Sequence, residues 1–233
     1  MSAFAIFVEG QTELIFVERL LFAMLGYQDL RIELEKQYGG LYHEIGVRGA
    51  PPENAFYKVL LVNCACDGKV LPAIEERAGR LRNAGYDGIL GLRDIHPTPS
   101  SELEEIYRLT ADRLVSMPLP CKVVIAVREI EAWFIADTGH FVRYNPALTS
   151  AFIQQRIGVD VERRDVEQIS HPSKLLNEIY NLVGDEYHKK LKEAHRVVNN
   201  LSYEYLYLEA PDSVPALKKF LDELDVAMVR SPS

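Results

Sequence analysis

The 233-residue sequence has few cysteines, no long apolar run and no excess of basic side chains. Three cysteines are too few, and odd in number, for a disulfide framework, so we expect a cytoplasmic protein. Cys64 and Cys66 have no second Cys or His pair at ligand spacing, which favours buried thiols over a metal site. No run of about 18 apolar residues occurs, and the first residues lack a basic segment, so we expect neither a membrane span nor a signal peptide.

Acidic side chains outnumber basic ones, 34 to 26, which gives a formal net charge of −8. This balance excludes a basic coat spread over the surface for binding nucleic acid. Any contact with phosphate must therefore be local, or must use a metal ion as its positive charge. The hydrophobic share of 48% is that of an ordinary globular chain.

Short apolar runs alternate with helical patterns along the first part of the chain. The runs predict buried strands at 4–8, 58–63, 88–92 and 121–127, with an edge strand at 31–34. The patterns between them predict helices near 12–24, 69–83 and 100–117, and a helix or turn at 129–136. This order is typical of an α/β, Rossmann-like fold, in which a mostly parallel sheet has helices on both faces.

The strands stop after about residue 138, and only helices are predicted beyond it. They are expected near 147–157, 174–183, 187–199 and 213–224. We therefore predict an α/β domain over 1–137 and a C-terminal helical extension over 138–233 that packs on it.

Acidic side chains follow each of the four buried strands. The residues at these ends are Glu9 and Glu13; Asn63 and Asp67; Asp94 and His96; and Arg128, Glu129 and Glu131. In open parallel sheets, functional residues gather at the carboxyl ends of strands. Carboxylates gathered there repel one another unless a cation joins them, and hard oxygen ligands suit Mg²⁺. The pattern predicts a divalent-metal site for phosphodiester hydrolysis or phosphoryl transfer.

Each of these acids also has a structural interpretation. The helix dipole alone favours an acid such as Glu13 in the first turn of a helix. Glu9 and Asp94 end buried strands, where an ionised carboxylate needs a cation or a donor. Glu129 and Glu131 would diverge on a regular helix, so both serve one site only if a turn intervenes. Glu131 is slightly favoured.

Three stretches at these strand ends resemble motifs of Toprim domains. Val8-Glu9-Gly10-x-Thr12-Glu13 resembles the first Toprim motif, in the variant of the overcoming-lysogenization-defect (OLD) nucleases. Asp94-Ile95-His96 falls where Toprim domains carry a paired-aspartate motif. The stretch REIEAWFIAD at 128–137 closely resembles the Toprim-like family catalogued as domain of unknown function 4276. The resemblance covers about residues 3–137 and implies a Toprim-like fold.

The resemblance also implies roles for individual residues. Glu9 would act in acid–base or metal chemistry, Asp94 would bind Mg²⁺, and Glu13 and Glu131 would be the further metal ligands of OLD-type nucleases. His96 stands where the family has its second aspartate. A nitrogen ligand is poorer for Mg²⁺ and better for Mn²⁺, but His96 is equally a candidate general base or the mark of a degenerate site.

Basic side chains near these motifs are candidate phosphate contacts. Arg93 and Arg128 either contact phosphate or pair with the neighbouring acids. Lys174, Lys189 and Lys190 of the helical extension either neutralise charge in a transition state or lie on a solvated helix face.

The leading hypothesis is therefore a nuclease dependent on Mg²⁺ or Mn²⁺, acting on nucleic acid through a local surface. By resemblance it belongs to phage defence, with a partner ATPase or effector protein. The alternative is a binding or sensor module that kept a Toprim scaffold without catalysis. A third hypothesis is a phosphotransferase or phosphatase with Asp94 as its nucleophile.

Overall fold

The computed structural model describes residues 2–66, 68–95, 102–163 and 165–229. Its six strands are β1 (Ser2–Val8), β2 (Leu30–Tyr38), β3 (Leu41–Gly49), β4 (Tyr57–Asn63), β5 (Gly88–Asp94) and β6 (Cys121–Ala126). They form one sheet in the order β3-β2-β4-β1-β5-β6. The β1–β4, β1–β5 and β2–β4 pairs are parallel, and the β2–β3 hairpin is antiparallel. The predicted α/β class with a mostly parallel sheet is confirmed.

The helices follow the predicted pattern, with two short additions. They are α1 (Gln11–Leu25), α2 (Val70–Asn83), α3 (Leu103–Leu114), α4 (Glu131–Ala136), α5 (Gly139–Tyr144), α6 (Ser150–Ile157), α7 (Pro172–Asn181), α8 (Leu191–Val198), α9 (Tyr203–Leu208) and α10 (Pro215–Val229). The short α5 and α9 were not predicted, and neither was β3. In the described part of the chain, no helix is long and apolar enough to cross a membrane.

The chain divides into two compact units. Unit 1 comprises Met1–Arg93, Ser101–Ile125 and Lys219–Ser233, and unit 2 comprises Asp94–Ser100 and Ala126–Lys218. The predicted boundary at residue 137 falls inside unit 2. Most of the last helix, α10, belongs to unit 1, because unit 1 includes the chain from Lys219 onward.

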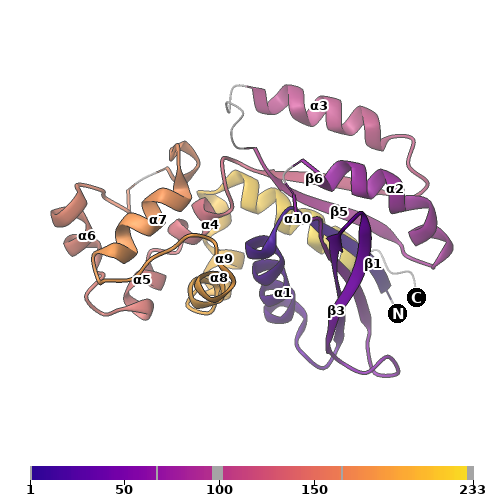
Figure 1. Ribbon diagram of the computed structural model, residues 1–233, viewed down its shortest axis with the longest axis horizontal. Helices are drawn as coiled ribbons and strands as arrows, with labels where there is room; N and C mark the ends of the chain where they lie inside the picture. Colours follow the sequence, from indigo (N-terminus) through magenta and orange to yellow (C-terminus); the bar gives the residue numbers. More distant parts are fainter. Residues whose placement is uncertain (1, 67, 96–101, 164, 230–233) are drawn as a thin grey trace. The chain divides into compact units, whose positions relative to one another are not determined.

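Unit 1 is a sheet covered on both faces. Successive side chains of a strand point to opposite faces, and β1 is apolar on both. Ala3, Ala5 and Phe7 pack in a core cluster with α2 residues such as Ile74. Figure 1 shows α2 and α3 on this side of the sheet, with α1 on the other.

Gly91 of β5 holds α2 close to the sheet. A methyl group there would lie 2.8 Å from Val70 Cγ1 and 2.9 Å from Val123 Cγ2. We expect Gly91→Ala to lower the free energy of unfolding by about 1–3 kcal/mol, because overpacking strains a dense core. Gly79 of α2 has open space around its Cβ position, so Gly79→Ala is the matched control and is expected to be neutral or stabilising. Urea denaturation measures both; equal effects would contradict this packing.

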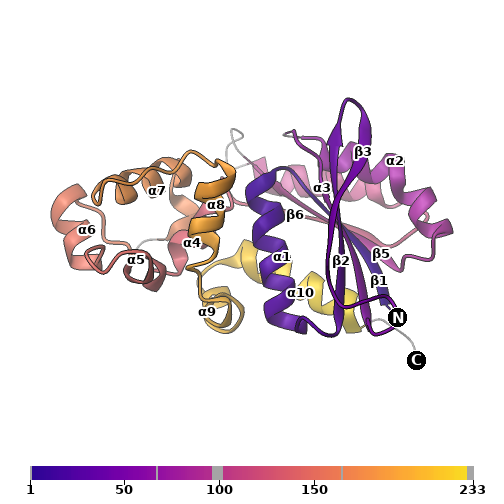
Figure 2. The same ribbon diagram turned by 60° about the horizontal axis from the view of Figure 1, so that its bottom comes forward.

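Unit 2 has its own core, built from short helices around aromatic side chains. Trp133 and Phe134 of α4, Phe141 of α5 and Tyr180 of α7 are all buried. Figure 2 shows α4 to α8 gathered in this part of the chain. The fully buried His140 lies among them, with Nδ1 2.6 Å from the carbonyl oxygen of Asp137 and Nε2 2.9 Å from the Tyr180 hydroxyl.

Burial of His140 makes unit 2 sensitive to acid. Desolvation disfavours the imidazolium and lowers the pKa of His140 from 6.5 to about 4. The unfolded chain therefore binds a proton between these pH values while the folded chain does not. The contribution of His140 to the free energy of unfolding is complete above about pH 6.5. It decreases by about 3 kcal/mol as the pH falls to 4. We expect His140→Gln to flatten this part of the pH dependence in urea denaturation, whereas the exposed His43→Gln leaves it steep; an unchanged slope in His140→Gln would refute the assignment.

Candidate functional site

Two buried carboxylates flank Gly10 at the carboxyl end of β1. Glu9 is 6% exposed and Glu13 is 5% exposed. Gly10 is extended and caps α1 through its backbone alone, so the helix begins directly after the strand. The Glu13 carboxylate folds back over this turn, since a methyl group at Gly10 would lie 2.9 Å from Glu13 Oε2. The absence of a side chain at Gly10 thereby allows the Glu13 carboxylate to lie against the turn.

Neighbouring strands supply donors to Glu9. Its Oε1 accepts a hydrogen bond of 2.8 Å from the backbone nitrogen of Gly68, in the segment between β4 and α2. Arg93 of β5 places Nε 4.0 Å from the same oxygen. Thus the predicted pairing of Arg93 with an acid is present, and Glu9 is held where β1, β4 and β5 end.

The thiol beside this carboxylate is protonated. Burial, and secondly the charge of Glu9, raise the pKa of Cys64 to about 12. Cys66, two residues on, is exposed. The prediction of a buried thiol is therefore confirmed for Cys64 and is wrong for Cys66.

A second group of acids lies in unit 2, around Lys189. Its ammonium Nζ is 3.1 Å from Glu129 Oε1 and 2.9 Å from Glu131 Oε2. Asp94 also attracts this ammonium, and its Oδ1 accepts a 3.1 Å hydrogen bond from the Ile130 nitrogen. We call Asp94, Glu129, Glu131 and Lys189 the lysine cluster.

The local backbone explains why both glutamates reach one lysine. Glu129 lies in the turn before α4, and Glu131 is the first residue of the helix, so the two do not diverge as they would on a continuous helix. Arg128 before them has φ 70°, and Lys189 has φ 57°. These left-handed conformations are costly for residues other than glycine and are found where the surrounding structure enforces them.

The charges of the lysine cluster stabilise each other. Burial opposes the charge on Lys189, yet Glu131, Asp94 and Glu129 together raise its pKa. Burial likewise opposes ionised Glu129, but Lys189 and Ser173 outweigh it and lower the pKa of Glu129. Tyr187, which is buried, donates from its hydroxyl to Glu131 Oε1 over 2.7 Å.

The remaining predicted residues either make none of the contacts above or lie outside the described part of the chain. Lys174 on α7 is exposed, as a solvated helix face requires. Lys190 is also exposed, with 71% of its side chain accessible. Arg128 lies in the turn before α4. His96 lies outside the described residues.

Ser173 and Tyr187 were not predicted from the sequence. Lys189 was assigned with Lys190 to a helix over 187–199, but α8 starts at Leu191. The turn before it frees Lys189 from the helix face. The sequence did not indicate a polar role for Tyr187, because it fits the apolar positions of the helix predicted over 187–199.

The acids of unit 1 fit a hard divalent cation that keeps most of its water. Glu9 and Glu13 offer carboxylate oxygens, the ligands of Mg²⁺ and Mn²⁺, and Gly10 has no side chain to displace the Glu13 carboxylate. Within the residues that the structure describes, no group of three or more Cys, His, Asp or Glu side chains is placed to hold a metal.

Glu131 fits a metal less well. Its side chain is fully buried, Oε1 accepts from Tyr187 and Oε2 faces Lys189. The ammonium thus takes the place at Glu131 that a cation would need.

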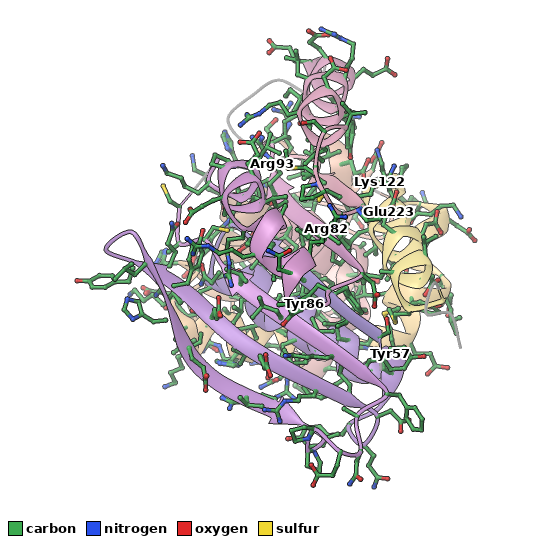
Figure 3. The ribbon with its side chains drawn as sticks, turned by 90° about the vertical axis from the view of Figure 1, so that its right-hand side faces the viewer. Tyr57, Arg82, Tyr86, Arg93, Lys122 and Glu223 are labelled. Atoms are coloured by element: carbon green, nitrogen blue, oxygen red, sulfur yellow. The ribbon has the colours of Figure 1, made fainter. Side chains whose placement is uncertain are left out.

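One cavity of unit 1 lies away from these acids. It has a volume of about 270 Å³ and is lined by residues that include Phe4, Gly88, Lys122 and Glu223. Figure 3 shows Lys122 and Glu223 beside each other. It also shows that Tyr86, just before β5, and Arg93, near the end of β5, lie far from each other. The cavity is therefore at the end where β5 and β6 begin, and open α/β sheets place their chemistry at the opposite end.

Comparisons of this chain with protein-family models, with curated proteins and with solved structures find no match.

Proposed function

We propose that this protein is a divalent-metal-dependent enzyme that hydrolyses phosphodiester bonds of nucleic acid. The observation that carries the proposal is the pair of buried carboxylates at Glu9 and Glu13, flanking Gly10 at the end of the central strand. Burying two acids at the end of one strand is unfavourable unless a cation or donors stabilise them. A metal ion would supply that charge, and it would also supply an activated water and a contact for phosphate.

The chain's own residues have assigned roles in this proposal. Glu9 and Glu13 bind the metal, and the Gly68 nitrogen and Arg93 hold the Glu9 carboxylate in place. Asp94 belongs to the lysine cluster of unit 2, and only its resemblance to the Toprim aspartate motif assigns it to metal chemistry. The resemblance further assigns His96 as a ligand or general base, and places the protein in phage defence with a partner ATPase or effector.

The activity is expected to depend wholly on the metal. Supercoiled plasmid, single-stranded DNA and RNA are incubated with the protein and Mg²⁺ or Mn²⁺, and the products are resolved by electrophoresis. We expect cleavage of at least one substrate, loss of cleavage with excess EDTA, and recovery when the metal is restored. Cleavage that persists in EDTA, or no cleavage of any substrate with either metal, would contradict the proposal.

A second candidate function is a binding module without catalysis. The observation that favours it is Lys189, which neutralises the acids of unit 2 with the protein's own charge. Such a module would bind a partner or nucleic acid with the same affinity in Mg²⁺ and in EDTA. The two functions thus differ in their response to metal removal.

A further inference from the structure

The carboxylate of Glu129 lies in a setting that is built for an oxyanion. Its Oε2 accepts a 2.9 Å hydrogen bond from the Ser173 nitrogen, and its Oε1 accepts one of 2.9 Å from the Ser173 hydroxyl. Lys189 Nζ lies 3.1 Å from Oε1. Three donors from two separate segments therefore converge on one carboxylate.

Ser173 belongs to the first turn of α7, which begins at Pro172 and is ten residues long. The backbone nitrogens of a helix's first turn have no partner within the helix and carry partial positive charge. A helix N-terminus, a serine hydroxyl and a lysine together are the donors that phosphate groups use in proteins. Glu129 thus occupies a position whose chemistry also suits a phosphate.

Glu131 adds an independent observation at the same lysine. Its side chain is fully buried, and its Oε2 forms an ion pair of 2.9 Å with Lys189 Nζ. Lys189 is therefore positioned by a contact that does not involve Glu129.

A second glutamate in unit 2 shows what a plain helix cap looks like. Glu167 Oε1 accepts a 2.8 Å hydrogen bond from the Ala216 nitrogen, where α10 begins with Pro215. The helix start has the same order, a proline followed by the capped residue. In the described part of the chain, no lysine or arginine lies within ion-pair distance of Glu167, and Ala216 has no hydroxyl. Only the Glu129 setting combines all three kinds of donor.

We propose that Ser173, the N-terminus of α7 and Lys189 form a subsite for a phosphate group of the substrate, and that Glu129 fills it until substrate displaces it. The inference rests on the proposed function, because it names the part of the protein that binds the nucleic-acid backbone. It makes Glu129 a competitor of phosphate and not a metal ligand.

Binding of inorganic phosphate tests the subsite without any metal or nuclease activity. Glu129→Ala vacates the position, and we expect this variant to bind phosphate about tenfold more tightly than the wild-type chain in calorimetry and in thermal shift. Adding Lys189→Met to Glu129→Ala is expected to abolish the gain, and adding Ser173→Ala to reduce it. Glu167→Ala, which removes the plain cap, is expected to bind phosphate no better than wild type.

The outcomes separate this inference from the proposed function. Equal phosphate affinity in Glu129→Ala, Glu167→Ala and wild type would overturn the subsite, whether or not the protein cuts nucleic acid. A gain in Glu129→Ala that Lys189→Met removes would support it even if no cleavage is found. If circular dichroism shows that Glu129→Ala is unfolded, Glu129→Gln decides, with a smaller gain expected and no gain overturning the proposal.

Discussion

Replacing Lys189 with methionine is expected to destabilise the protein by about 3 kcal/mol. The change leaves Glu129 and the fully buried Glu131 without their common cation, and breaking one side of a buried ion pair typically costs about 3–5 kcal/mol. The lower end applies because 36% of the Lys189 side chain is exposed, so water screens part of the charge. Urea denaturation at pH 7 measures the loss.

Lys190→Met is the matched control for this variant. Lys190 is the next residue and carries the same charge, but it is mostly exposed, so we expect a change within about 0.5 kcal/mol. Adding Glu131→Gln to Lys189→Met should restore part of the stability, because the neutral amide removes the uncompensated buried charge. Similar losses for Lys189→Met and Lys190→Met would show that the lysine cluster contributes no specific stability.

Glu9→Gln is expected to reduce the rate of metal-dependent cleavage by about 10²- to 10⁴-fold, the range seen when an acid–base group is lost. Glutamine keeps the shape and can still accept the Gly68 hydrogen bond, so the fold is retained while the charge that would bind the metal is lost. The measurement is the single-turnover cleavage rate in saturating Mn²⁺, with circular dichroism as the check on folding.

Glu44→Gln makes the same change on the exposed edge strand β3 and is expected to cleave at the wild-type rate. Asp94→Asn tests the second assigned acid in the same assay. Wild-type rates in both Glu9→Gln and Asp94→Asn would leave the proposed chemistry without its two main acids.

The sheet could be predicted because its strands carry their own signal. Runs such as Phe4–Val8 are apolar throughout, and helical patterns alternate with them. Strands of this kind bury both faces in a parallel sheet with helices on both sides. The hairpin strand β3 was missed because its residues are largely exposed and because Gly39, Gly40 and Gly49 are typical of loops. An exposed edge strand has little hydrophobic pattern to detect.

The acids of the candidate site could be predicted, but not their partners. Glu9 and Asp94 each stand at the end of an apolar run, so the neighbouring sequence was enough to place them at strand ends. Lys189 reaches Glu131 across 58 positions of the chain, from a left-handed turn that no spacing rule indicates. The sequence therefore suggested that all the clustered acids needed a metal, whereas those of unit 2 have a lysine of the chain as their cation.

The most direct test of the central claim is the position of a bound metal. Crystals of the full chain are grown with Mn²⁺, and its anomalous scattering is mapped. The account predicts an anomalous peak coordinated by the carboxylates of Glu9 and Glu13, and no peak on Glu131. A map with no peak at Glu9 or Glu13, in crystals where Mn²⁺ is present, would contradict it.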